Sequence, residues 1–264
     1  MSPTLIMIHG AFAGGWSFAP LCAYFEARGF RCVAPDLRHH GADAKHGAAT
    51  ALATTSMRDY ADDICQLIDA QDTPPLLIGH SMGGLLAQML ATRRKLAGAV
   101  LLAPSAPWGV LASSVLEMVG ATSLLLNGTP WEQPVYPIYQ VAAEYTFDRL
   151  PMHERQAAFA KLGPESGRAC FEILHWPLDA QRATFVFPRE VTCPLLTLVG
   201  SRDSVNPPET VRRVARRYRH ASDFQVLRGM SHWLIAEPGW EEVAARIEDW
   251  IGTLGWGDVS RRSQ

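Results

Sequence analysis

The sequence is poor in cysteine, and the few cysteines that it has match neither a disulfide framework nor a metal site. Their number is odd, and no C-x-x-C pair occurs among them. Free buried thiols are therefore the expectation, which fits a reducing cytoplasm and a protein without a bound metal. The five are Cys22, Cys32, Cys65, Cys170 and Cys193.

Long apolar runs and an excess of one charge are also missing. No stretch reaches the ~18 apolar residues of a membrane-spanning helix, and the opening residues MSPTLIMIHG lack the basic start of a signal peptide. The 24 basic and 26 acidic side chains leave a net charge of −2, which supplies no field to draw the chain onto nucleic acid or anionic membrane. The sequence therefore predicts a cytoplasmic protein without nucleic-acid or membrane partners.

What the sequence does have is a regular alternation of apolar strands and helical patterns. Four continuous apolar runs are typical of buried parallel strands; they are Leu5–Ile8, Leu76–Ile78, Val100–Leu102 and Leu195–Val199. Two weaker runs, Arg31–Ala34 and Phe224–Leu227, suit positions nearer the sheet edges. Helical patterns lie between them, at Phe18–Arg28, Met57–Ala70, Met82–Arg94, Pro208–Tyr218 and Trp240–Leu254. The alternation predicts a three-layer α/β/α sandwich around a mostly parallel sheet.

The alternation stops between residues 106 and 188. That segment is rich in proline and aromatic residues and has short helical patterns such as Met152–Leu162. A structureless loop of this length is improbable inside a compact domain. We therefore expect a core domain formed by residues 1–105 and 189–264, with residues 106–188 inserted as a helical cap.

The strongest chemical signal is G-x-S-x-G between a predicted strand and a predicted helix, at residues 79–83. A strand that turns directly into a helix forces a strained backbone on the corner residue, Ser81. Glycine at positions 79 and 83 removes side chains that would collide there. The amides at the start of the helix then point at the serine, which favours developing negative charge. The pattern predicts that Ser81 is a nucleophile.

A serine nucleophile needs a base, and His232 follows the last predicted strand. Loops at the carboxyl ends of parallel strands converge on one edge of a sheet, so His232 and Ser81 can meet there. The other histidines suit a polar loop (His39, His40, His46), the surface (His153, His175, His220), or structural positions beside the motif and at the end of the first strand (His80, His9).

The base needs a carboxylate that fixes its tautomer, and Asp203 follows the strand before His232. Asp36 is a rival by its position at the same edge, but it precedes the serine and is interpreted as a loop-stabilising residue. Glu237 is too close to His232 in sequence to orient its ring. The order Ser81, Asp203, His232 is the chain order of α/β-hydrolases.

An oxyanion hole completes such a site. One donor is expected to be the backbone N–H of Met82, directly after the nucleophile, and the second a backbone N–H of the glycine-rich loop at residues 9–16. No G-K-[ST] follows this loop, so it is not a P-loop.

These motifs resemble those of the α/β-hydrolase superfamily over nearly the whole chain. The matching segments are His9-Gly10-Ala11, Pro35 to Gly41, Gly79 to Gly84, Gly200 to Asp203 and Gly229 to Trp233. The loop from His9 to Trp16 is similar to that of plant methyl-salicylate-type esterases and hydroxynitrile lyases. By that resemblance Ala11 and Met82 supply the oxyanion amides. The sequence departs from the family pattern in two places. The chain begins at the first central strand, so the family's N-terminal antiparallel strands are expected to be missing. In addition, Arg38-His39-His40-Gly41 replaces the commoner R-G-H-G.

The resemblance implies a fold and a set of catalytic parts, but not a substrate. We expect an enzyme without metal or organic cofactor that cleaves a carboxylic ester through an acyl-enzyme, and the apolar insertion favours a small to medium apolar substrate. The same residues could instead cleave a lactone, a thioester or a carbon–carbon bond. A hydroxynitrile-lyase-like reaction is disfavoured because the lyases carry a catalytic lysine in the insertion, and here the only lysine of that segment, Lys161, is expected on an exposed helix face. A non-catalytic small-molecule receptor is the third alternative. The chain could be a monomer or a homodimer.

Overall fold

The computed structural model describes residues 2–41, 49–113, 130–218 and 222–256, and its centre is a parallel sheet. The six strands have the order β2-β1-β3-β4-β5-β6, and every neighbouring pair is parallel. They are β1 (Leu5–Ile8), β2 (Cys32–Val33), β3 (Leu76–His80), β4 (Gly98–Leu102), β5 (Leu195–Gly200) and β6 (Ser222–Leu227). The strand order changes direction at β1, because β2 lies on one side of it and β3 to β6 lie on the other. Open parallel sheets form their binding and active sites at the carboxyl edge beside such a switch point.

All six predicted strands are confirmed, including their division into central and edge strands. The four central strands are completely buried. The two weaker runs form the edges, where β2 is half-buried and β6 is half-buried or exposed up to its last residue, Leu227. An edge strand has a neighbour on one side only, so it tolerates the polar residues that weakened its sequence signal.

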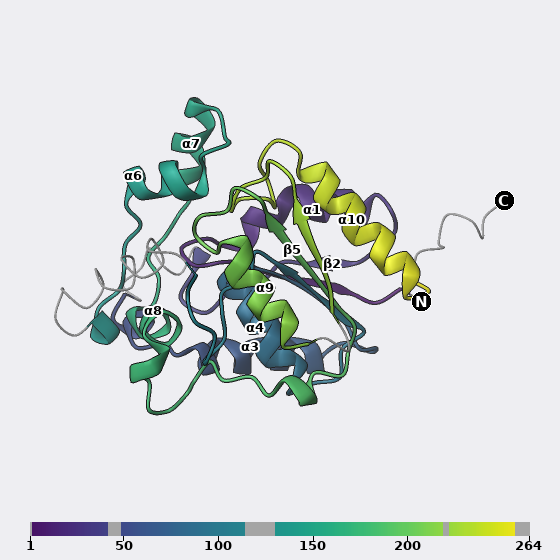
Figure 1. Ribbon diagram of the computed structural model, residues 1–264, viewed down its shortest axis with the longest axis horizontal. Helices are drawn as coiled ribbons and strands as arrows, with labels where there is room; N and C mark the ends of the chain where they lie inside the picture. The colour runs from purple at the N-terminus through teal and green to yellow at the C-terminus, as the bar shows by residue number, and fades with distance from the viewer. Residues whose placement is uncertain (1, 42–48, 114–129, 219–221, 257–264) are drawn as a thin grey trace.

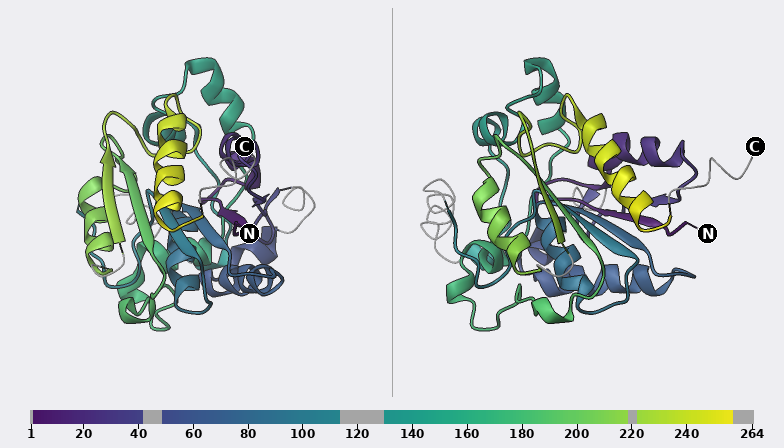
Figure 2. Two further views of the ribbon diagram at one scale, coloured as in Figure 1. Left: turned by 90° about the vertical axis from the view of Figure 1, so that its right-hand side faces the viewer. Right: turned by 45° about the vertical axis from the view of Figure 1, so that its right-hand side comes forward.

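Helices cover both faces of the sheet (Figures 1 and 2). One face is covered by α1 (Ala19–Glu26) and α10 (Trp240–Thr253), and the other by α3 (Met57–Asp69), α4 (Met82–Ala91) and α9 (Pro208–Arg216). The predicted three-layer sandwich is therefore confirmed. Local signals set the start of α3, where the Ser56 hydroxyl and the Asp59 carboxylate form a capping box.

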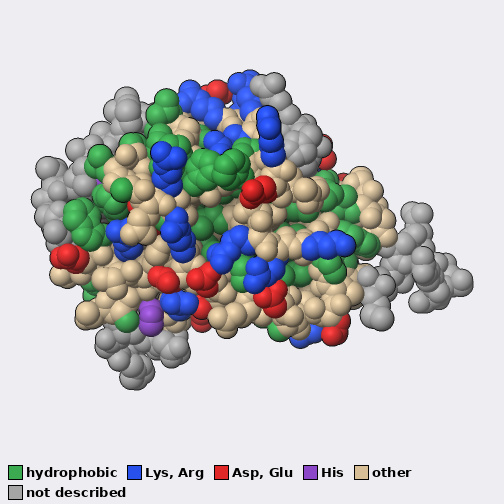
Figure 3. All heavy atoms as spheres, turned by 90° about the horizontal axis from the view of Figure 1, so that it is seen from below, with side chains coloured by type: hydrophobic (Ala, Val, Ile, Leu, Met, Phe, Trp, Pro, Cys, Tyr) green, Lys and Arg blue, Asp and Glu red, His purple; other side chains and the backbone are tan. Residues whose placement is uncertain are grey.

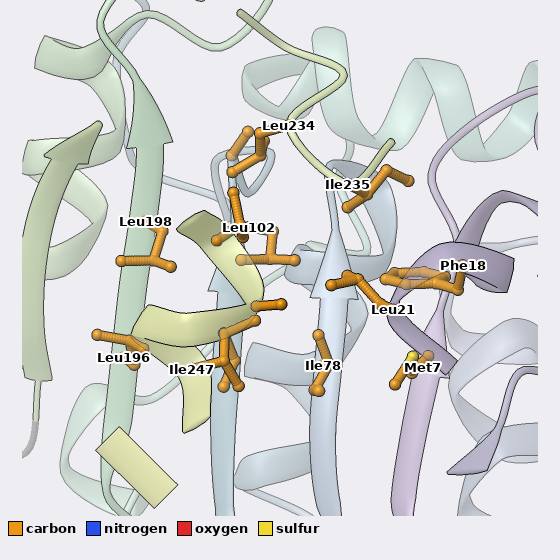
Figure 4. Close-up of a cluster of buried hydrophobic side chains, with 14 of the residues drawn as sticks. Met7, Phe18, Leu21, Ile78, Leu102, Leu196, Leu198, Leu234, Ile235 and Ile247 are labelled. Carbon is orange, nitrogen blue, oxygen red and sulfur yellow. The ribbon is translucent and has the colours of Figure 1, made fainter. Parts of the chain in front are cut away.

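Each side of the sheet has its own apolar core. Figure 4 shows the first, in which side chains of α1 and α10 meet those of the central strands. Among these, Leu21, Ile78, Leu198 and Ile247 are completely buried. These two cores fix the strands relative to one another, and thereby the loops at the carboxyl edge.

Where the structure describes it, the segment between β4 and β5 consists of short helices joined by irregular stretches, with one isolated antiparallel bridge between Val135 and Glu165. Its elements are η3 (Pro130–Glu132), α6 (Tyr139–Val141), η4 (Ala142–Thr146), α7 (Met152–Phe159), α8 (Gly167–Leu174) and η5 (Trp176–Leu178), followed by η6 (Pro188–Glu190). Helices α6 and α7 stand away from the sheet in Figure 1, whereas α8 packs on the α3 side. The boundaries 106 and 188 of a separate cap stay a prediction.

The surface carries charges of both signs. In Figure 3, basic and acidic side chains are interspersed with apolar ones over the face seen from below. In the part of the chain that the structure describes, no helix has the length and apolar character needed to cross a bilayer.

Candidate active site

Ser81 occupies the corner between β3 and α4 with a strained backbone. Its φ is +52° and its ψ −116°, a region that residues other than glycine rarely adopt. The surroundings hold it there: the Ser81 N–H donates to the Leu102 carbonyl, and the Ser81 carbonyl accepts from the N–H groups of Gly84 and Ser105, each at 2.9 Å. Strain of this kind persists only where neighbouring contacts enforce it.

The glycines around Ser81 are required by close backbone approaches. A Cβ on Gly79 would lie 2.2 Å from the Gly83 carbonyl oxygen, and one on Gly83 would lie 2.0 Å from the carbonyl oxygen of Ile8. Both distances show that these positions have no room for a side chain, as the pattern predicts. The turn is thus locked between β1, β3 and the first turn of α4.

Asp203 and His232 lie in the loops after β5 and β6, and the structure brings them together. The His232 Nδ1–H donates to Asp203 Oδ2 at 2.9 Å. The other oxygen, Oδ1, accepts from the backbone N–H groups of Val205 and Asn206 at 2.9 and 2.8 Å. Because a carboxylate only accepts, the proton of the neutral ring sits on Nδ1 and leaves a lone pair on Nε2. That nitrogen can take a proton from a hydroxyl.

His80 connects the loop of His232 with the turn of Ser81. The His80 Nε2–H donates to the His232 carbonyl at 2.8 Å, and the two rings are 4.9 Å apart. Burial, and secondarily the charge of His232, lowers the pKa of His80 to about 3. His80 is therefore neutral. Because it directly precedes Ser81, its hydrogen bond joins the turn of Ser81 to His232, which is consistent with a structural position.

The loop at residues 9–16 lies against Ser81. A Cβ on Gly10 would be 3.0 Å from the Cβ of Ser81, so Ala11 follows a residue in direct contact with the serine. His9 fixes the base of this loop because its Nδ1–H donates to the Gly10 carbonyl at 2.8 Å and its Nε2 accepts from the Leu37 N–H at 3.0 Å. Met82 is the first residue of α4, where backbone N–H groups have no partner within the helix.

The two rival acids have other partners. Asp36 accepts from the Gly15 N–H at 2.7 Å and so stabilises the loop at residues 9–16. Glu237 accepts from the Ser231 N–H at 2.7 Å and also from the Ser231 hydroxyl. Both observations agree with the choice of Asp203 as the partner of His232.

Sequence reasoning missed a buried polar cluster beside the site. Glu165, at 0% exposure, accepts from His40 Nε2 at 3.1 Å and from the Tyr60 hydroxyl at 2.7 Å. His40 was expected in a polar loop and is buried; His175 was expected at the surface, and only 5% of it is exposed. The replacement of R-G-H-G around His40 drew attention to this loop, but nothing near Glu165 pointed to the pairing.

A second missed contact reaches the His232 loop from the segment between β4 and β5. The Arg149 guanidinium donates to the carbonyls of Gly229 and Pro238, and its Nε lies 3.4 Å from Glu237 Oε1. Glu237 in turn holds Ser231, the neighbour of His232. Among the residues that the structure describes, no group of three or more His, Cys, Asp or Glu side chains is arranged to hold a metal ion.

Comparison with known proteins identifies a family and several relatives of this chain. The family described as "Alpha/beta hydrolase family" matches residues 5–246. Salicylic acid-binding protein 2 of Nicotiana tabacum is 34% identical over 148 residues, which are 51% of this chain and 55% of that protein. A pyrethroid hydrolase of Sphingobium wenxiniae is 34% identical over 101 residues, 37% of this chain and 34% of the relative. The aligned regions thus span about a third to a half of these curated relatives.

The similarity to solved structures extends over the whole fold. A methylesterase, MES16, from Arabidopsis has a TM-score of 0.72 and covers 95% of this chain and 99% of its own, at 15% sequence identity. At that identity the likeness concerns the fold alone.

Proposed function

This chain belongs to the alpha/beta hydrolase family, and from that premise we propose that it is a serine hydrolase that cleaves a carboxylic ester of a small to medium apolar substrate. Ser81 is the nucleophile, His232 the base and Asp203 the acid that orients it. The backbone N–H groups of Ala11 and Met82 form the oxyanion hole. No metal or organic cofactor takes part.

The reaction runs in two halves that each return the proton. The Ser81 oxygen attacks the ester carbonyl carbon while its proton passes to His232 Nε2, and the carbonyl oxygen becomes an oxyanion held by two amides. The intermediate collapses, and the departing alcohol takes the proton from His232. Water then attacks the acyl-serine and gives a proton to His232, and collapse releases the acid as Ser81 regains its proton.

The observation that carries the proposal is the hydrogen bond of 2.9 Å between His232 and Asp203 on a loop tied to the strained turn of Ser81. A strained corner is costly unless it serves the chemistry. A histidine with a buried carboxylate on one nitrogen and a free second nitrogen is what a serine base requires.

The segment at residues 106–188 is proposed as a cap that excludes water and selects the substrate. Its contacts to the core through Glu165 and Arg149 support this. The balanced surface charge supports a small apolar molecule as the partner, rather than nucleic acid or membrane. A cytoplasmic location, and either a monomer or a homodimer, belong to the same proposal.

The alternatives use the same residues differently. A lactone, a thioester or a carbon–carbon bond could be cleaved by the same triad. A lyase with a catalytic lysine is disfavoured because Lys161, the only lysine of the segment at residues 106–188, is exposed. A ligand receptor keeps the fold without turnover, and the relative named for binding salicylic acid makes it the second candidate.

Two substitutions test the proposal. With p-nitrophenyl acetate, Ser81→Ala and His232→Ala should each lower kcat by at least ~10³-fold, because the nucleophile or its base is removed while the rest of the site persists. Circular dichroism checks that each variant is folded. An unchanged rate in either folded variant would refute the assignment, and a wild type inert towards esters, lactones and thioesters would favour the receptor.

A further inference from the structure

Phe12, directly after the proposed oxyanion donor Ala11, has a backbone conformation that its side chain disfavours. Its φ is +65°, in the left-handed region where a Cβ is crowded. Phe12 has a Cβ and cannot adopt this conformation as readily as glycine, so tertiary contacts must hold it there. Whatever holds Phe12 also sets the direction of the adjoining peptide units of the loop.

Two hydrogen bonds from a distant segment hold the Phe12 backbone on both sides. The Gly163 N–H donates to the Phe12 carbonyl at 2.9 Å, and the Phe12 N–H donates to Glu165 Oε2 at 3.3 Å. In each of these two bonds, the donor and the acceptor lie about 150 positions apart in the sequence. The loop at residues 9–16 is therefore held by residues of the proposed cap.

Glu165 is itself fixed by four donors. Besides Phe12, its oxygens accept from Tyr60 at 2.7 Å, from the Ser166 N–H at 2.7 Å and from His40 at 3.1 Å. Burial alone would raise the pKa of Glu165, but the charge of His40 and these hydrogen bonds outweigh it and lower the pKa. The carboxylate thus remains an acceptor at neutral pH, and it is anchored to α3 and to the loop after β2 at once.

We propose that Glu165 is a positioning residue for the oxyanion hole: by holding Phe12 in the left-handed conformation it aims the neighbouring Ala11 N–H at the oxygen that becomes negative. The inference rests on the proposed function and deepens it, since it links the cap segment to the chemistry. Glu165 touches no reacting atom. It acts only through Phe12.

A buried glutamate of the same segment provides a matched control. Glu172 is 1% exposed, and it accepts from the Ser56 hydroxyl at 2.9 Å and from the Met57 N–H at 2.8 Å. It therefore ties the same segment to the start of α3, away from the loop at residues 9–16. Loss of Glu172 should weaken the fold in a comparable way without moving Phe12.

The test compares Glu165→Gln, Glu165→Asp and Glu172→Gln. Glutamine has one oxygen, so it cannot accept from all the donors around Glu165, and aspartate keeps the charge but shortens the reach to Phe12. Rates with p-nitrophenyl acetate are divided by the number of serines titrated with a fluorophosphonate, so that unfolded protein does not count. A trifluoromethyl ketone, which forms a tetrahedral adduct, measures binding of the oxyanion.

Both Glu165 variants should lower kcat by about 10- to 100-fold, because a misplaced donor loses part of the ~10²–10³-fold that one oxyanion donor contributes. KM should change by less than about threefold, and affinity for the trifluoromethyl ketone should fall in parallel with kcat. Glu172→Gln should keep wild-type kcat and ketone affinity while its Tm falls.

Two outcomes overturn the inference, and they differ in what else they overturn. If the Glu165 variants keep wild-type kcat and ketone affinity, or lose no more than Glu172→Gln, Glu165 has no positioning role while the esterase proposal stands. If the wild type neither turns over esters nor reacts with the fluorophosphonate, both proposals fail together. Should one Glu165 variant not fold, the other decides.

Discussion

At Asp203 the two carboxylate oxygens have different partners, and this asymmetry leads to a prediction. Oδ1 faces two backbone N–H groups and Oδ2 faces His232. In Asp203→Asn the amide oxygen stays with the backbone donors, so the NH₂ group faces His232 and forces the ring proton onto Nε2. That tautomer cannot act as a base, and kcat should fall by about 10³- to 10⁴-fold, measured by ester hydrolysis at pH 7.

Asp36→Asn is the comparison, because Asp36 was the rival acid and binds Gly15. It should lose less than about 10-fold. A larger loss in Asp36→Asn than in Asp203→Asn would exchange the two assignments.

Gly83 gives a prediction on stability. A Cβ at this position would lie 2.0 Å from a backbone oxygen of β1, whereas one at Gly252, in α10, meets no atom within 4 Å. Gly83→Ala should therefore lower the free energy of unfolding by about 3 kcal/mol or more, and Gly252→Ala should raise it by about 0.4–1 kcal/mol. Urea unfolding of the two variants checks this, and equal midpoints would contradict the close approach.

At the scale of the element, Arg149 joins the segment between β4 and β5 to the His232 loop. Among the residues that the structure describes, Arg155, in α7, donates to carbonyls of its own segment, those of Leu150, Ala143 and Asp148. Arg149→Gln should lower kcat by about 5- to 10-fold, because small misplacements of a base are costly. Arg155→Gln should lower Tm and leave kcat near the wild type. Steady-state kinetics and thermal unfolding separate the two, and equal kcat values would show that the Arg149 contact does not position His232.

The elements themselves could be predicted because their signals are local. The apolar run at Leu5–Ile8 coincides with β1, and the helix patterns at Met57–Ala70 and Pro208–Tyr218 match α3 and α9 to within one or two residues. Their ends are set by capping residues and prolines that a sequence displays. In contrast, α8 was not predicted, since Gly167–Leu174 spans only eight residues.

The candidate site divides in the same way. Ser81, Asp203 and His232 could be proposed from the sequence because each follows a predicted strand, and strand ends meet at one edge. The pair of Glu165 and His40 could not, because 125 positions separate the residues and neither stands in a repeating pattern. Glu165 meets these partners only where the folded chain buries it, and the sequence alone does not show which residues are brought together there.

At the scale of the whole molecule, two completely buried histidines predict how stability depends on pH. Burial lowers the pKa of His9 to about 4 and that of His80 to about 3, whereas both return to about 6.5 on unfolding. The unfolded state therefore binds more protons below pH 6.5, so stability is full above that pH and falls as the pH falls. Between the unfolded and the folded pKa, each histidine lowers the free energy of unfolding by about 1.4 kcal/mol for each unit by which the pH falls.

Between pH 7 and pH 5 the two together should lower the free energy of unfolding by about 4 kcal/mol. His40 acts in the opposite sense: burial lowers its pKa, but the charge of Glu165 outweighs this and raises it. We expect the two neutral histidines to outweigh it. Urea midpoints measured at both pH values test the sum, and His80→Gln, which keeps a donor to the His232 carbonyl and does not titrate, should flatten the dependence. Equal midpoints at pH 7 and 5 would refute it.

The central claim is that the chain carries one activated serine at the turn between β3 and α4, and a fluorophosphonate measures this most directly. Intact-mass and peptide mass spectrometry of the labelled wild type should find a single adduct, on Ser81. The adduct should be absent in Ser81→Ala and should form at least ~10³-fold more slowly in His232→Ala. An unlabelled wild type, or an adduct on a different residue, would contradict the account.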